Sequence, residues 1–207
     1  LHYPLRRQRQ MCIRDRSSAL VAYGFARFEF PFKKQLFALL LATLMLPNSV
    51  VIIPRYVLFN KFGWVDSYMP WWVPAILACY PFFIYQLIQF MRSIPRDLDE
   101  SAYIDGCSTF RVFWQILLPL MKSSLFSAGL FQFLWTYNDY FNSLIFINSV
   151  KKYTVSLALR LSVDAESVVV WGRVMAMACV AVLPLVLLFF AAQKYFVEGI
   201  ATSGLKG

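Results

Sequence analysis

Long runs without charged residues constrain the fold of this chain more than any other feature of its sequence. Three runs hold no charge and a fourth is interrupted only by Asp139; they cover residues 35–54, 67–91, 174–193 and 123–150. A bilayer core of about 30 Å needs roughly 20 helical residues, whose backbone polar groups must bond within the segment. The sequence therefore predicts an all-α, polytopic membrane protein with four complete spans. Prolines within the runs are expected to kink the helices rather than break them: Pro47, Pro74, Pro81 and Pro184.

Composition and charge exclude the main soluble classes. Apolar residues make up 59% of the chain and charged residues 15%, whereas soluble domains have about 45 to 50% and about 25%. The chain has a net charge of +9. Beyond residue 16, its basic residues occur in short clusters between the apolar runs. Such clusters are typical of membrane loops, so the predicted environment is a lipid bilayer and no nucleic acid is expected as a partner. One histidine and no C-x-x-C pair predict no metal site.

Basic residues also predict the orientation of the chain. The loops at residues 27–34 and 92–122 hold Arg27, Lys33, Arg92 and further basic residues. The positive-inside rule places such loops in the cytoplasm. Counting spans from these loops then places the C-terminus in the cytoplasm as well.

The first residues are expected to differ from the remainder. Residues 1–16 are basic and without periodicity, which predicts a non-native or disordered segment; the alternative is a basic cytoplasmic tail. Residues 17–26 are apolar but too short to cross a bilayer, and we interpret them as the end of a further helix. The membrane domain is therefore expected over residues 17–207, with its N-terminal part truncated.

The loop between the runs 67–91 and 123–150 has the most specific pattern, and we call residues 93–119 the signature loop. Ser93 is a suitable N-cap for a short acidic helix, which Gly106 is expected to end in a left-handed conformation. Ser108 is expected to cap a second helix. The second helix carries an apolar stripe suited to the membrane interface, formed by Phe110, Phe113, Trp114 and Leu117.

At these residues the chain resembles the permease subunits of ABC importers. Their signature is E-A-A, three residues, G, nine residues, I, one residue and L-P. The same spacing is found here, with serine in place of the middle alanine, at Glu100, Ser101, Ala102, Gly106, Ile116, Leu118 and Pro119. The likeness extends to the carbohydrate-type importers, particularly their maltose-type second permease, through residues 22–31, 43–47, 59–68, 137–145 and 194–207.

This resemblance implies a type I ABC importer transmembrane domain and a function in transport rather than catalysis. The chain would form the translocation path for a sugar or oligosaccharide in the bacterial inner membrane. The implied partners are a second permease subunit, two ATPase subunits that carry ATP and Mg, and an extracytoplasmic solute-binding protein. The chain itself has no G-x-x-x-x-G-K-[ST] loop, so we expect neither a nucleotide cofactor nor catalytic residues in it.

The resemblance also assigns the signature loop a role. In the family this loop docks on the ATPase, so the expected coupling residues are Glu100, Ser101, Ala102, Asp105, Gly106, Ile116, Leu118 and Pro119. The alternative is an amphipathic loop that rests on the lipid headgroups. The C-terminal tail is expected to contact the ATPase pair through Glu198, Gly199 and Lys206; by composition alone it would be a frayed chain end.

One ionisable residue falls within a predicted span. Asp139, with Asn138 and Asn142, could line the translocation path, because a charged residue in a span usually has a function. These residues could equally cap or pack a helix at the outer interface. An ion-coupled secondary transporter is the functional alternative, but it should show several ionisable residues within its spans, and only Asp139 qualifies here.

Overall fold

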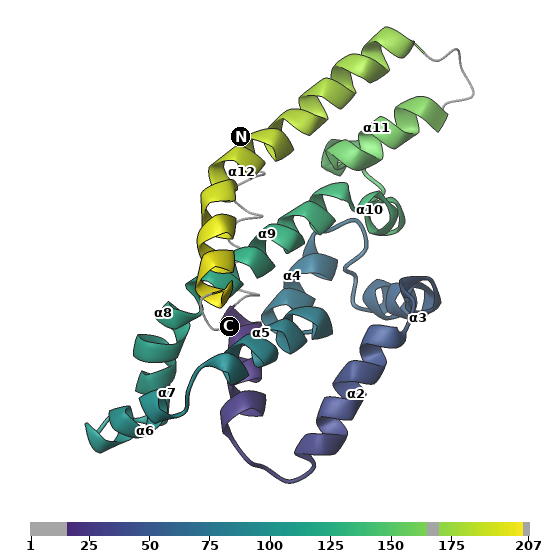
Figure 1. Ribbon diagram of the computed structural model, residues 1–207. Coiled ribbons are helices and arrows are strands. Elements are labelled where there is room, and N and C mark those ends of the chain that lie inside the picture. The colour runs from purple at the N-terminus through teal and green to yellow at the C-terminus, as the bar shows by residue number, and fades with distance from the viewer. Residues whose placement is uncertain (1–15, 165–169, 205–207) are drawn as a thin grey trace. The chain divides into compact units, whose positions relative to one another are not determined.

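The computed structural model describes residues 16–164 and 170–204, and within these ranges it contains helices and no strand (Figure 1). The prediction of an all-α protein is therefore confirmed. The described residues form two compact units: unit 1 comprises 16–51 and 71–129, and unit 2 comprises 52–70, 130–164 and 170–204.

Unit 1 begins with a helix over residues 16–27 and contains the signature loop. Its helix α2 packs against α5. The helices that lie wholly in this unit are α2 (Lys33–Met45), α5 (Pro81–Ser93), α6 (Asp97–Ile104), α7 (Thr109–Val112), a π-helix (Phe113–Leu117) and α8 (Leu118–Leu120).

The core of unit 1 lies between residues 16–27, α5 and residues 112–121. Small side chains on residues 16–27, among them Ala19 and Ala22, are fully buried in the same cluster as Leu87 and Ile88 of α5. Small residues let helices approach closely, which favours packing in a membrane. The helix over residues 16–27 is thus an integral part of the unit.

One sequence expectation about the second helix of the signature loop is wrong. The four apolar residues of the predicted interfacial stripe do not share a surface: Phe113 and Leu117 are buried in the core, whereas Phe110 and Trp114 are exposed. The reason is tertiary packing. The ring of Tyr23 lies 5.0 Å from that of Phe113, so the helix over residues 16–27 covers this side of the loop.

Two of the four prolines break helices instead of kinking them. Leu46, before Pro47, is extended, and α2 and α3 (Asn48–Lys61) meet there at 103°. Proline disfavours helical geometry in the preceding residue, which explains the break. Pro81 opens α5 after α4 (Met69–Ile76) has ended. The other two prolines lie inside helices, Pro74 in α4 and Pro184 in α12.

The described helices are long and apolar enough for two to four membrane crossings. Two stretches qualify by themselves, Met69–Ser93 and Trp171–Phe190. Two more qualify if each bent pair counts as one span: Lys33–Met45 with Asn48–Lys61, and Thr109–Leu120 with Lys122–Asn138. Each of the four predicted spans overlaps one of these candidates, but two candidates are sharply bent, and residues 139–150 of the predicted run 123–150 lie beyond the bent pair that ends at Asn138.

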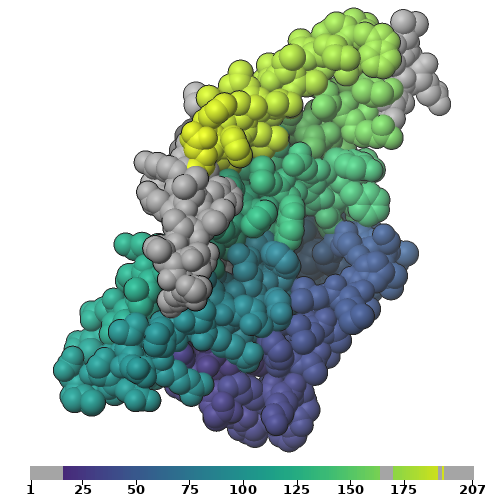
Figure 2. All heavy atoms as spheres, in the orientation of Figure 1, coloured from purple at the N-terminus to yellow at the C-terminus, as the bar shows by residue number. Residues whose placement is uncertain are grey.

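Unit 2 is built on the C-terminal helices. In it α10 packs against α11, and α11 packs against α12. Its elements after α9 (Lys122–Asn138) are α10 (Tyr140–Phe146), a 3-10 turn (Val150–Lys152), α11 (Val155–Asp164) and α12 (Trp171–Gly204). Apolar side chains along α12 are exposed, including those of Val180, Leu187 and Phe190, and Figure 2 shows the described part of this helix on the surface in yellow-green. Lipid or another apolar helix suits such a surface.

Candidate functional site

The signature loop folds into two short helices that protrude from one end of unit 1 (Figure 1). The first does not begin where the sequence suggested. Ser93 is the last residue of α5 and its hydroxyl donates to the carbonyl oxygen of Phe90 at 2.7 Å, so it caps no following helix. Ile94 is extended before Pro95, as the proline requires. Helix α6 therefore starts only at Asp97.

The turn between the two helices agrees with the sequence expectation. Gly106 has a φ of 80°, and its N–H donates to the carbonyl oxygen of Tyr103 at 3.1 Å. The next N–H, of Cys107, donates to Ala102 at 2.9 Å, so the last carbonyls of α6 are satisfied by a glycine-ended cap. The hydroxyl of Ser108 accepts from the N–H of Arg111 at 3.4 Å and caps α7. Both capping predictions are confirmed.

The expected coupling residues divide between the core and the surface. Ala102 is buried in the core of unit 1, and Ile116 and Leu118 pack against that core. These three residues hold the loop to the unit. The remaining five are exposed and available to a partner: Glu100, Ser101, Asp105, Gly106 and Pro119.

The structure adds two surface residues that sequence reasoning missed. Ile104, at the end of α6, is 86% exposed, and its neighbour Tyr103 is exposed as well. Apolar side chains gain free energy when they are covered, so both are candidate contacts. The available signal was an apolar pair inside an otherwise acidic helix.

A buried ion pair connects α6 to the helix over residues 16–27. Arg27 Nε lies 2.7 Å from Asp99 Oδ2, and the two side chains are 7% and 9% exposed. Arg27 also donates through Nη2 to the carbonyl oxygen of Ile94 at 3.1 Å. A second arginine, Arg96, donates to the carbonyl oxygen of Ala26 at 3.4 Å. The protruding helix is therefore fixed to the helix over residues 16–27 through polar contacts on both sides.

Burial dominates the electrostatics of this pair. Removal of water from the Asp99 carboxylate raises its pKa above the usual value, although Arg27 and Arg96 act in the opposite direction. Sequence reasoning treated Asp99 only as an acidic residue near a helix N-terminus. Its partner is 72 residues away in the chain, so no local pattern reveals the pair.

The predicted path residues lie at the break between α9 and α10. Asp139 is the N-cap of α10: its Oδ1 accepts from the N–H of Asn142 at 3.1 Å. The side-chain amide of Asn142 donates to the same carboxylate at 2.9 Å. Asn138 turns back onto its own helix and donates to Leu134 at 2.9 Å. The capping alternative is thus realised for Asp139, and it leaves a role in transport open to experiment.

An arginine that sequence reasoning omitted completes this polar cluster. Arg55 Nη2 donates to Asn142 Oδ1 at 2.6 Å, and its guanidinium lies 5.8 Å from the ring centre of Phe146. Arg55 follows immediately after the charge-free run 35–54 and is therefore not part of that run. We call Arg55, Asp139 and Asn142 the polar cluster of unit 2.

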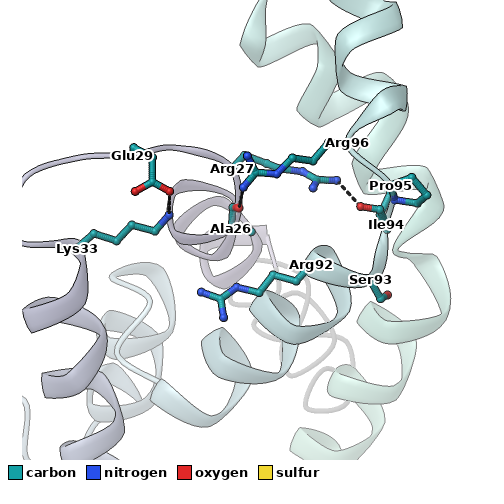
Figure 3. A pocket seen from close by; sticks show the side chains of 9 residues that line it. All are labelled: Ala26, Arg27, Glu29, Lys33, Arg92, Ser93, Ile94, Pro95 and Arg96. Atoms are coloured by element: carbon teal, nitrogen blue, oxygen red, sulfur yellow. Dashed lines mark hydrogen bonds and ion pairs between the residues drawn. The ribbon is translucent and has the colours of Figure 1, made fainter.

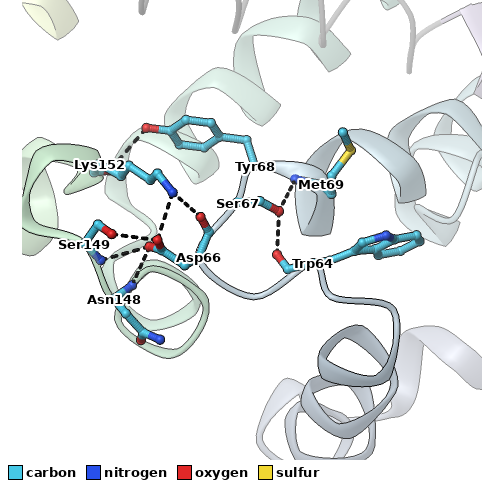
Figure 4. A network of polar contacts seen from close by, with 8 residues as sticks. All are labelled: Trp64, Asp66, Ser67, Tyr68, Met69, Asn148, Ser149 and Lys152. Atoms are coloured by element: carbon cyan, nitrogen blue, oxygen red, sulfur yellow. Dashed lines mark hydrogen bonds and ion pairs between the residues drawn. The ribbon is translucent and has the colours of Figure 1, made fainter.

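A second polar network in unit 2 joins the loop after α3 to the turn after α10 (Figure 4). The Asp66 carboxylate accepts from the N–H groups of Asn148 at 3.0 Å and Ser149 at 2.9 Å. Lys152 lies 2.8 Å from the same carboxylate and also donates to the Asp66 carbonyl oxygen. Lys152 and Ser149 together hold the pKa of Asp66 well below its usual range. We call this network the Asp66 clamp.

The structure describes only part of the predicted tail contacts. Glu198 and Gly199 lie in α12. The side chain of Glu198, the whole of Lys206 and residues 1–15 lie outside the described residues.

Comparison with known families and proteins identifies similar chains. The family described as "Binding-protein-dependent transport system inner membrane component" matches residues 18–202. The probable ABC transporter permease protein YurM of Bacillus subtilis (strain 168) is 35% identical over 190 residues, which cover 92% of this chain and 63% of that protein. The trehalose/maltose transport system permease protein MalG of Thermococcus litoralis is 31% identical, with 92% and 68% covered.

Two further similarities concern a third permease and the fold. The sn-glycerol-3-phosphate transport system permease protein UgpE of Brucella abortus is 33% identical, with 88% of this chain and 64% of that protein covered. The chain thus spans 63% to 68% of the length of these three relatives. A crystal structure of a bacterial ABC transporter involved in the import of the acidic polysaccharide alginate matches with a TM-score of 0.76 at 19% identity, covering 90% of this chain and 71% of that chain.

Proposed function

Because this chain belongs to the family of binding-protein-dependent transport system inner membrane components, we propose that it is a permease subunit of an ATP-driven importer of sugars or oligosaccharides. The names of its relatives support a carbohydrate or a related polyol phosphate as the substrate class. In this proposal the chain lines the translocation path, a separate pair of subunits binds ATP and Mg, and a solute-binding protein delivers the substrate. A second permease subunit completes the path.

Coupling to the ATPase is assigned to the signature loop, and the observation that carries this assignment is the exposed end of α6. Glu100, Ser101 and Ile104 lie on the surface of a protruding helix whose other side is buried in the core. A helix that combines a rigid base with an exposed acidic and apolar tip suits insertion into a groove on another protein. We assign this end to the cytoplasm, as the basic residues around it favour.

The buried ion pair connects the exposed end of α6 to the helix over residues 16–27. A force applied to α6 reaches the helix over residues 16–27 through Asp99 and Arg27 at 2.7 Å, and through the packing of Ala102 in the core. Packed interiors are stiff, so a movement of the tip is transmitted instead of being absorbed. In this way closure of the ATPase pair would move the helices that border the path.

The polar cluster of unit 2 is our candidate for substrate contact. Arg55 supplies N–H donors, Asp139 supplies acceptors and the amide of Asn142 supplies both, which is the set of groups that sugar hydroxyls need. In this structure Asn142 bonds to both Arg55 and Asp139. A sugar would replace part of that network.

The contact of the tail at Glu198, Gly199 and Lys206 with the ATPase remains part of the proposal, as does the cytoplasmic C-terminus. The family match names a binding-protein-dependent system, and no contact among the described residues favours the ion-coupled alternative.

The test is a charge reversal on the exposed surface of α6. In cells that express the complete importer, Glu100→Lys is expected to reduce sugar uptake at least tenfold and to reduce co-purification of the ATPase, while the chain remains in the membrane. The matched control is Lys151→Glu, a charge reversal on the exposed turn after α10, which should retain the ATPase. Parental uptake with the ATPase bound in Glu100→Lys would contradict the assignment.

A further inference from the structure

A cationic cavity opens beside the base of the signature loop. It has a volume of about 420 Å³ and lies between residues 26–33 and residues 92–96 of unit 1 (Figure 3). Four basic side chains border it: Arg27, Lys33, Arg92 and Arg96. A cavity with this concentration of positive charge favours an anion.

Not all of this charge is compensated inside the protein. Arg27 is paired with Asp99, and Lys33 is paired with Glu29 at 2.8 Å. Within the described part of the chain, no carboxylate lies at ion-pair distance from Arg92 or Arg96, and both residues are exposed. Two guanidinium groups at the mouth of one cavity suit a phosphate, whose oxygens accept hydrogen bonds from such planar donors.

An aromatic cavity adjoins the cationic one. The two share Glu29, Lys33 and Arg92, and the second is bordered by the rings of Phe25, Phe30, Phe32 and Phe37. The Arg92 guanidinium lies 5.3 Å from the ring centre of Phe37, at the boundary between them. A ligand that fills both cavities must carry an anionic group next to an apolar one.

Phe32 makes the apolar side accessible. Its side chain is 72% exposed, and its φ of 62° lies in a region that bulky residues rarely adopt. An exposed phenylalanine beside Lys33 and Lys34, at the start of the apolar helix α2, matches the composition of a membrane interface.

We propose that these two adjoining cavities bind one anionic phospholipid, with its phosphate at Arg92 and Arg96 and its acyl chains along Phe30, Phe32 and Phe37. This inference rests on the placement of the chain in the inner membrane, and it goes beyond the coupling function. Such a lipid would lie against both the loop 27–34 and the base of the signature loop, so it would stabilise the position of α6.

Native mass spectrometry of the purified chain in detergent tests the proposal. The chain is titrated with palmitoyl-oleoyl-phosphatidylglycerol and with the zwitterionic palmitoyl-oleoyl-phosphatidylcholine. We expect the parent chain to bind the anionic lipid more tightly than the zwitterionic one. Affinity for the anionic lipid should fall about fivefold in Arg92→Gln, and about fivefold again when Arg96→Gln is added. The control Lys61→Gln with Lys151→Gln removes two exposed positive charges in unit 2 and should bind like the parent.

Further measurements identify the source of the phosphate and test whether the aromatic cavity contributes to binding. Phe32→Asn tolerates the left-handed backbone but lacks the ring, so it should weaken binding of the lipid. Equal affinity for both lipids, or equal loss in the cavity and control variants, would overturn the proposal. Displacement of the lipid by an equimolar amount of inorganic phosphate would assign the cavity to free phosphate, and displacement by the ATPase subunits would assign it to protein contact. Both results would also overturn it.

This experiment uses no ATPase in its main arm and measures no transport. A failure of lipid binding therefore leaves the coupling function standing, and a failure of Glu100→Lys to impair uptake leaves the lipid site standing.

Discussion

At the scale of single residues, Arg27 and Asp99 should respond differently to substitution. Arg27→Met leaves a buried carboxylate without its cation, and loss of one partner of a buried pair costs about 3 kcal/mol. Asp99→Asn should cost less, because the asparagine oxygen can still accept a hydrogen bond from the Arg27 guanidinium, which also keeps its bond to the Ile94 carbonyl oxygen. Thermal unfolding in detergent measures both. The exposed Asp97→Asn, on the same helix, is the control. If Asp99→Asn proves the more damaging change, the carboxylate charge is required and our interpretation of the pair is wrong.

The same pair predicts a dependence on pH. The pKa of Asp99 is raised by burial in the folded chain, so the folded state binds its proton up to a higher pH than the unfolded state. The contribution of Asp99 to stability is therefore greatest below its unfolded pKa and is lost as the pH rises through its folded pKa. Arg27→Met should strengthen this trend, because it removes the opposing cation. Its unfolding temperature is expected to recover partly when the pH is lowered from neutral towards 5; an unchanged or lower value at pH 5 would contradict this.

Gly106 should tolerate substitution according to backbone conformation rather than size. No atom lies within 4 Å of the position that a Cβ would occupy, but the φ of 80° disfavours most side chains. Gly106→Val should lower stability by roughly 1 kcal/mol or more and displace Tyr103 and Ile104, which reduces coupling. Gly106→Asn, which accepts the left-handed region, should retain most uptake. Equal loss in both variants would mean that a partner surface, and not the turn, demands glycine.

At the scale of elements, the Asp66 clamp should control the turn at residues 148–152. Asp66→Asn removes the charge that Lys152 and two backbone N–H groups share. Faster amide hydrogen exchange at Asn148 and Ser149 is expected at neutral pH. Because the pKa of Asp66 is lowered in the folded state, its contribution is present above the unfolded pKa of about 4 and is lost only as the pH falls further. A gap between the parent and Asp66→Asn that closes already at pH 6 would exclude this explanation.

Elements whose causes are local could be predicted from the sequence. The cap bonds at Gly106 and Ser108 join residues three to five positions apart, and both predictions are confirmed. The break at Pro47 was underestimated because a hydrophobic run does not reveal how far a proline bends it. Phe113 was misplaced because its partner Tyr23 comes from a distant segment.

The polar contacts of the candidate site were the hardest to foresee. Arg27 with Asp99, and Arg55 with Asn142, are separated by 72 and 87 residues. Periodicity and capping rules report on neighbours within a few turns, so they contain no signal for such pairs. The tertiary fold alone brings these residues together.

At the scale of the whole molecule, we assign the two units different tasks. Unit 1 carries the signature loop and its buried ion pair, and unit 2 carries the polar cluster and the exposed apolar surface of α12. The central claim is that the exposed tip of α6 contacts the ATPase in the cytoplasm. Two highly exposed apolar residues allow a matched comparison, Ile104 in α6 and Val150 in the turn after α10, at 86% and 75%.

The most direct measurement replaces each of these two residues with a photo-cross-linking phenylalanine derivative in cells that express the complete importer. After illumination, we expect a covalent adduct with the ATPase subunit from position 104 and none from position 150. An adduct from position 150, or no adduct from position 104 in a complex that still hydrolyses ATP, would contradict the claim that this helix couples the permease to its energy source.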